Sequence, residues 1–146
     1  MVFQKEVNKT SLFLARRLGK LYNIHDNEIV SYEVDFQKSR ITLHTIGDNK
    51  DSATITIEFI DVLAHMFETQ LQGSIILDIS TLEVSRILKD NKELLDKQKN
   101  YGWPMHYETM EDLLEYLQNE KYNYYVISAS YGLNGWVIAK EYKIYN

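Results

Sequence analysis

Apolar and polar residues alternate in three successive segments, and this period of two constrains the fold more than any other feature. It runs over residues 30–36, 41–44 and 55–59, with polar segments at 37–40 and 47–51 between them. Successive side chains of a β-strand point to opposite faces of the sheet, so the pattern predicts strands with one buried and one solvated face. Because the connections are short, we expect an antiparallel meander.

Two further regions predict β structure. Residues 74–79 form a nearly continuous apolar run, which is typical of a strand covered on both faces. Residues 124–130 and 136–140 are rich in β-branched and aromatic residues and flank a segment with two glycines, Tyr131-Gly132-Leu133-Asn134-Gly135. Because glycine permits the positive φ of tight turns, this region predicts a hairpin.

Helical periodicity appears in the remaining segments. It predicts helices over 11–22, 81–98 and 109–119, and one or two helical turns within 59–68. The helix at 109–119 begins with Thr109 and Asp112, the spacing of a capping box. We therefore expect one α+β domain over residues 1–146, with an antiparallel five- or six-stranded sheet and helices packed on one face.

Composition excludes several functional classes. The 146 residues include no cysteine and carry a formal net charge of −5. Disulfides, zinc ribbons and iron–sulfur ligation are therefore excluded, and the acidic balance argues against a nucleic-acid partner. The N-terminus has no signal-peptide pattern, and no apolar stretch approaches the roughly 20 residues of a membrane span. We expect a cytoplasmic protein with no membrane partner.

The most site-like group of residues is Asp61, His65 and Glu68. If 59–68 is helical, spacings of four and three residues place all three on one helix face. An imidazole between carboxylates can orient a general base or supply part of a metal shell. Further ligands would have to come from elsewhere in the chain, namely His44, Asp78 or His106. The alternative is a hydrogen-bonded histidine on a helix surface.

Recognised motifs for cofactors and metals are absent. The spacing around His65 is not the His-Glu-x-x-His zinc signature, and neither a Gly-x-Gly-x-x-Gly loop nor a P-loop occurs. No Gly-x-Ser-x-Gly nucleophile elbow is present either. The sequence therefore predicts no cofactor and no metal.

An acidic segment is the stronger candidate for binding. Residues 104–120 contain five acidic residues and neither lysine nor arginine, and aromatic residues lie beside them. Complementary charge accelerates encounter with a basic partner, and aromatic side chains supply contact area. The predicted partner-binding residues are Trp103, Tyr107, Glu108, Glu111, Asp112, Glu115 and Tyr116. A solvated helix face is the other interpretation.

Aromatic residues are concentrated near the C-terminus. Nine of the 11 tyrosines and both tryptophans follow residue 100. Tyrosine and tryptophan are favoured at interfaces, so the C-terminal sheet could form a homodimer. The alternative is a sheet face filled by aromatic residues of high strand propensity.

Four stretches carry a resemblance to a known family: 32–36 (YEVDF), 61–68 (DVLAHMFE), 101–104 (YGWP) and 130–140 (SYGLNGWVIAK). They resemble small cytosolic proteins of low-GC Gram-positive bacteria, which are similar to the immunity proteins that accompany polymorphic toxins. The resemblance extends over about residues 28–144 and implies a binding protein without catalytic residues. Nuclease toxins are commonly basic, which suits the acidic segment.

Three functional hypotheses follow. The first is a non-enzymatic cytosolic binding protein that neutralises a basic toxin. The second is a small metal-dependent or acid–base enzyme that uses His65 with Asp61 and Glu68. The third is a homodimeric structural protein.

Overall fold

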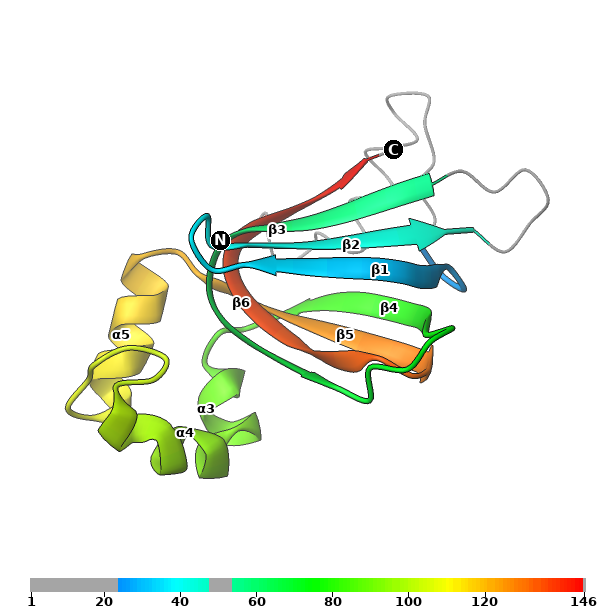
Figure 1. Cartoon of the computed structure of the whole chain (residues 1–146). Helices are drawn as coiled ribbons and strands as arrows, with labels where there is room; N and C mark the ends of the chain where they lie inside the picture. Colours follow the sequence, from blue (N-terminus) through cyan, green and yellow to red (C-terminus); the bar gives the residue numbers. More distant parts are fainter. Residues whose placement is uncertain (1–23, 48–53, 146) are drawn as a thin grey trace.

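The computed structural model describes residues 24–47 and 54–145, and the helix expected at 11–22 lies outside them. The described residues form six antiparallel strands, ordered β1-β2-β3-β6-β5-β4 around a closed barrel (Figure 1). The strands are β1 (Glu28–Asp35), β2 (Arg40–Ile46), β3 (Thr54–Glu68), β4 (Ile75–Leu82), β5 (Asn123–Tyr131) and β6 (Asn134–Tyr145). Between β4 and β5 lie α3 (Arg86–Asp90), α4 (Lys92–Gln98), the 3₁₀ helix η1 (Lys99–Tyr101) and α5 (Met110–Asn119).

The long strands β3 and β6 shape the barrel. The first half of β3 pairs with β2, and β6 pairs with β3 along almost its whole length. The barrel closes where β1 meets β4, through the register pair Glu28 and Ile75 and the neighbouring hydrogen bond from the Ile29 amide to the Ser74 carbonyl at 2.8 Å. The predicted meander of β1, β2 and β3 is confirmed.

Two hydrophobic cores stabilise this arrangement. The first fills the barrel, with Phe59 and Tyr125 fully buried at its centre. The second lies between the outer face of the barrel and the helices, where Leu113 and Leu117 of α5 are fully buried. Helices α3, α4 and α5 gather at one end of the barrel (Figure 1). The predicted α+β domain with helices packed on one face is thus confirmed.

Most C-terminal aromatic residues belong to these cores. The buried ones are Tyr124, Tyr125, Trp136 and Tyr142. Tyr125 packs edge-on against Tyr142 at 5.0 Å between ring centroids, and Trp136 packs against Tyr124 at 6.1 Å. These four residues therefore pack within the chain. Tyr131 and Tyr145, by contrast, are 51% and 41% exposed.

The predicted helical turns at 59–68 are wrong, because these residues continue β3 to Glu68. Asp61 has a φ of +56°, and the register with β6 shifts between Val62 and Ala64. Such a bulge inserts one residue and interrupts the alternation of the strand. Beyond it, one face of β3 packs on the barrel core and the other on the helical core. A strand with apolar residues on both faces loses the period of two, which explains the misassignment.

The single helix predicted over 81–98 is also corrected. Thr81 and Leu82 remain in β4, and the helical segment that begins at Arg86 breaks at Asn91, whose φ and ψ are −126° and 29°. The Asn91 side chain is held instead by tertiary contacts. Its Oδ1 accepts a hydrogen bond from the Trp136 indole at 3.0 Å, and its Nδ2 donates to the Tyr124 hydroxyl at 3.3 Å.

The predicted hairpin and the predicted capping box are both confirmed. Gly132 and Leu133 connect β5 to β6, and Gly132 has a φ of +83°. At the start of α5 the Thr109 hydroxyl accepts from the Asp112 amide at 3.1 Å, while the Asp112 carboxylate accepts from the Thr109 amide at 3.2 Å.

No helix within the described ranges has the length and apolar character needed to cross a lipid bilayer.

Candidate functional site

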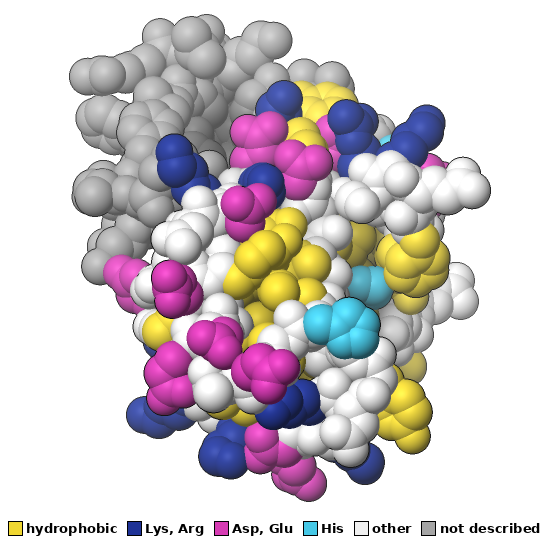
Figure 2. All heavy atoms as spheres, turned by 90° about the vertical axis from the view of Figure 1, so that its left-hand side faces the viewer, with side chains coloured by type: hydrophobic (Ala, Val, Ile, Leu, Met, Phe, Trp, Pro, Cys, Tyr) yellow, Lys and Arg dark blue, Asp and Glu magenta, His cyan; other side chains and the backbone are white. Residues whose placement is uncertain are grey.

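The outer side of α5 presents a row of carboxylates, which we call the acidic face of α5. It consists of the exposed residues Glu108, Glu111, Asp112 and Glu115. None of the four forms an ion pair with lysine or arginine in the described part of the chain. Figure 2 shows acidic side chains gathered beside a hydrophobic patch on the side of the molecule that carries α5. Within the described residues, these four carboxylates therefore form a negative surface without ion-pair partners.

The helix beneath the acidic face is firmly anchored. Leu113 and Leu117 point into the helical core with no exposed area, and the capping box fixes the first turn. Asp112 therefore has a structural role, since its carboxylate caps the Thr109 amide. Glu111 also lies in the first turn, where negative charge interacts favourably with the helix dipole. Of the residues on α5 itself, Glu115 is the one whose charge has no such local explanation.

The three aromatic residues predicted for partner binding pack against the helical core. Trp103 packs against Trp136 at 6.1 Å between ring centroids, and Tyr116 packs against Tyr122 at 6.2 Å. The Tyr107 hydroxyl donates to the Leu95 carbonyl at 3.4 Å. All three predicted aromatic residues are half-buried, so each contributes both to the helical core and to the surface.

One cation lies among these groups. The ammonium of Lys99 donates to the Glu108 carbonyl at 2.6 Å and lies 5.4 Å from the centroid of the Tyr107 ring. It therefore interacts with a backbone oxygen and an aromatic face, and it forms no ion pair with the carboxylates of the acidic face within the described residues. Burial, with Asp96 nearby, raises the pKa of the Tyr107 phenol.

The predicted catalytic residues Asp61, His65 and Glu68 do not share a face. His65 is on the side of β3 that carries Phe67, with 5.1 Å between the two ring centroids. Glu68 lies on the opposite side because successive strand residues alternate, and it lines a separate groove with Met66. Asp61 is exposed at the bulge, at the other end of this part of β3.

The environments of these groups differ accordingly. Burial lowers the pKa of His65. Asp61 lies instead near Tyr122. Burial raises the pKa of the Tyr122 phenol to about 12, with smaller contributions from Tyr116, Glu120 and Asp61. The spacing argument for a carboxylate–imidazole–carboxylate arrangement depended on a helix, and the strand removes it.

The additional metal-ligand candidates are distributed over the fold. His44 lies on β2, Asp78 lies on β4, and His106 lies in the segment before α5. The Asp78 carboxylate accepts from the Ser80 hydroxyl at 3.2 Å. Within residues 24–47 and 54–145, no three His, Asp or Glu side chains form a group that could hold a metal ion.

Tertiary structure does bring His65 close to Trp103. Both line a cavity of about 330 Å³ between the β1–β2 connection and the middle of β3. Phe36 lines it as well, is 83% exposed, and lies 6.4 Å from the His65 ring. The alternating pattern predicted Val30, Tyr32 and Phe36 on a buried strand face, but all three are exposed, and Phe36 follows the last residue of β1. Its place next to a polar turn segment is the sequence signal that could have indicated exposure.

The chain matches no protein-family model and no curated protein sequence. Among solved structures, it is similar to an uncharacterized protein from Neisseria gonorrhoeae determined by crystallography. The TM-score is 0.48 at 10% sequence identity, and the alignment covers 85% of this chain and 94% of that chain.

Proposed function

We propose that this protein is a non-enzymatic binding domain that neutralises a basic protein toxin through the acidic face of α5. One observation carries the proposal: the exposed carboxylates of Glu108, Glu111 and Glu115 have no lysine or arginine partner within the described residues. The resemblance of four stretches to immunity proteins suggests the class of partner, and the charge of the surface suggests that the partner is basic.

Electrostatics favour such a partner. Glu111 and Glu115 are four residues apart on one helix, and like charges at this spacing destabilise a helix by about 0.2–0.5 kcal/mol. A cationic surface would offset this repulsion on binding. It would also accelerate association, since complementary potentials raise encounter rates and salt screens them over about 8 Å at physiological ionic strength.

The packing beneath the acidic face supports the same function. Leu113 and Leu117 hold α5 on the barrel, so binding requires little ordering of the backbone. Trp103, Tyr107 and Tyr116, which are close to the carboxylates in the sequence, are only half-buried, so their exposed parts offer aromatic contact area. Aromatic residues surrounded by a polar rim are the usual composition of energetically important interface positions.

The decisive variant is the double substitution Glu111→Lys/Glu115→Lys. It reverses two charges and leaves Asp112 in place. Loss of the capping box would destabilise α5, and a weaker binding could then result from unfolding rather than from the change of charge. The matched control is Glu93→Lys, which reverses an exposed carboxylate in the first turn of α4. Circular dichroism and urea denaturation verify that all variants fold.

The partner to be tested is the product of the gene beside the one that encodes this protein. We expect its expression alone to arrest growth, and co-expression of the wild-type protein or the Glu93→Lys variant to restore it. The double variant should fail to protect, with an association rate constant at least roughly tenfold lower at low salt. A neighbouring product that is harmless or does not bind, or full protection by the double variant, would contradict the proposal.

A further inference from the structure

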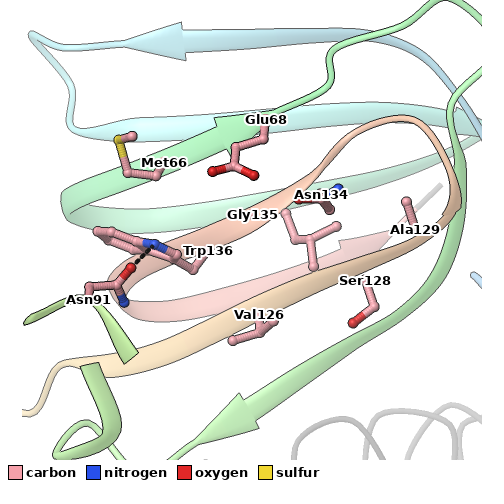
Figure 3. A pocket seen from close by; sticks show the side chains of 10 residues that line it. Met66, Glu68, Asn91, Val126, Ser128, Ala129, Asn134, Gly135 and Trp136 are labelled. Carbon is pink, nitrogen blue, oxygen red and sulfur yellow. Dashed lines mark hydrogen bonds between the residues drawn. The ribbon is translucent and has the colours of Figure 1, made fainter. Parts of the chain in front are cut away.

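A groove of about 450 Å³ lies on the outer face of the barrel, where it borders the helical core. Figure 3 shows its residues on β3, β5 and β6, with Asn91 of the α3–α4 break at one end. The residues that matter for its chemistry are Met66, Glu68, Asn91, Val126, Ser128 and Asn134.

Strand register arranges this surface in two parallel rows. Met66 pairs with Trp136, and Trp136 pairs with Val126, so these side chains form an apolar row across three strands. Glu68 pairs with Asn134 two residues further along. Ser128 is two residues beyond Val126 and therefore shares its face. The second row is thus polar and consists of a carboxylate, an amide and a hydroxyl.

The apolar end of the groove is preorganised by partly buried hydrogen bonds. The Trp136 indole donates to Asn91 Oδ1 at 3.0 Å, which is the dashed line in Figure 3. Asn91 Nδ2 donates to the Tyr124 hydroxyl at 3.3 Å, and that hydroxyl donates to Asp90 Oδ2 at 3.3 Å. The indole N–H is therefore already satisfied, and Trp136 contributes shape rather than a free donor.

The polar row consists mainly of acceptors. Glu68 is the ionisable side chain of the lining, and it forms no ion pair with lysine or arginine within the described residues. Asn134 Nδ2 donates to the Gly132 carbonyl at 3.4 Å, which leaves its carbonyl oxygen as an acceptor. The Ser128 hydroxyl adds a third oxygen. Such a surface disfavours anions and suits a ligand with several N–H donors.

We propose that this groove binds an arginine side chain from a protein or peptide. A guanidinium group has five N–H donors in a planar arrangement, which can reach Glu68 and a neighbouring oxygen at once. The three methylene groups of the stem would lie over the apolar row of Met66 and Val126. A lysine ammonium is a compact point charge and would use fewer of the acceptors. The inference is independent of the proposed function, since the groove does not include α5.

The probe is N-acetyl-arginine methylamide, titrated into ¹⁵N-labelled protein and followed by NMR. We expect saturable shifts of the Trp136 indole N–H and of the amides at 66–68 and 134–136. The citrulline analogue, which has the same shape without the charge, should cause no saturable shift. The lysine analogue should bind at least roughly threefold more weakly than the arginine compound.

Variants then test which residues recognise the charge. Glu68→Gln should weaken binding by roughly fivefold, as expected for one partly exposed ion pair. Glu93→Gln, an exposed carboxylate on α4, should leave binding unchanged. Glu111→Lys/Glu115→Lys should also bind normally, which separates this site from the acidic face of α5. Equal binding of citrulline, no effect of Glu68→Gln, or shifts confined to other surfaces would overturn the proposal.

Discussion

Replacing Thr109 by alanine should reduce the free energy of unfolding by about 1 kcal/mol. The substitution removes the hydroxyl that accepts from the Asp112 amide at 3.1 Å. The loss is moderate for two reasons. Thr109 is exposed, so water can reach the freed Asp112 amide. The second hydrogen bond of the capping box, from the amide of residue 109 to the Asp112 carboxylate at 3.2 Å, does not involve the threonine side chain and can remain. Leu113 and Leu117 remain buried and keep α5 in place.

Urea denaturation measures this effect. With a slope of about 2 kcal/mol per molar urea, 1 kcal/mol lowers the midpoint by about 0.5 M and leaves the slope unchanged. The expected decrease in melting temperature is about 3 °C. Asp112→Asn retains an acceptor and should cost less than Thr109→Ala. An unchanged midpoint for Thr109→Ala, or a changed slope, would refute the assignment of the capping box as a local contribution to stability.

Two further predictions concern the barrel. Gly135 has a φ of +153°, and a β-carbon there would overlap the Met66 carbonyl oxygen, so Gly135→Ala should destabilise by clearly more than about 1 kcal/mol. Gly73→Ala is the matched control because Gly73 also has positive φ, at +82°, but open space around it; equal losses in urea denaturation would contradict the steric argument. For His65, burial lowers the folded-state pKa below 6.5, so the unfolded state binds the proton more readily and stability should fall as pH drops below about 6.5. Between pH 7.5 and 5, wild type should lose more stability than His65→Phe, and parallel pH profiles would exclude this linkage.

Elements of the fold that depend only on residues close together in the sequence could be predicted from it. The alternation in β1, β2 and β3 indicated strands because side-chain direction has a period of two in any extended chain. The capping box of α5 involves residues only three positions apart, and the hairpin turn depends on Gly132. The exposure of the acidic residues on α5 followed from the same helical periodicity that buries Leu113 and Leu117.

The arrangement of the candidate sites could not be predicted in the same way. His65 and Trp103 are far apart in the sequence, and the cavity that they share lies beside the residues that follow the bulge of β3. The polar row of the groove likewise depends on the register that places Glu68 opposite Asn134. A shift of one residue in a strand would move each of these side chains to the other face.

By itself, the sequence determined the local elements, the absence of cysteine chemistry and a negative surface segment, since each of these depends on composition or on residues within one or two helical turns. Tertiary structure decided three things: the continuation of β3 to Glu68, the break at Asn91 and the separation of His65 from Glu68. The physical reason is that long-range strand pairing and the burial of both faces of β3 outweigh local helical periodicity.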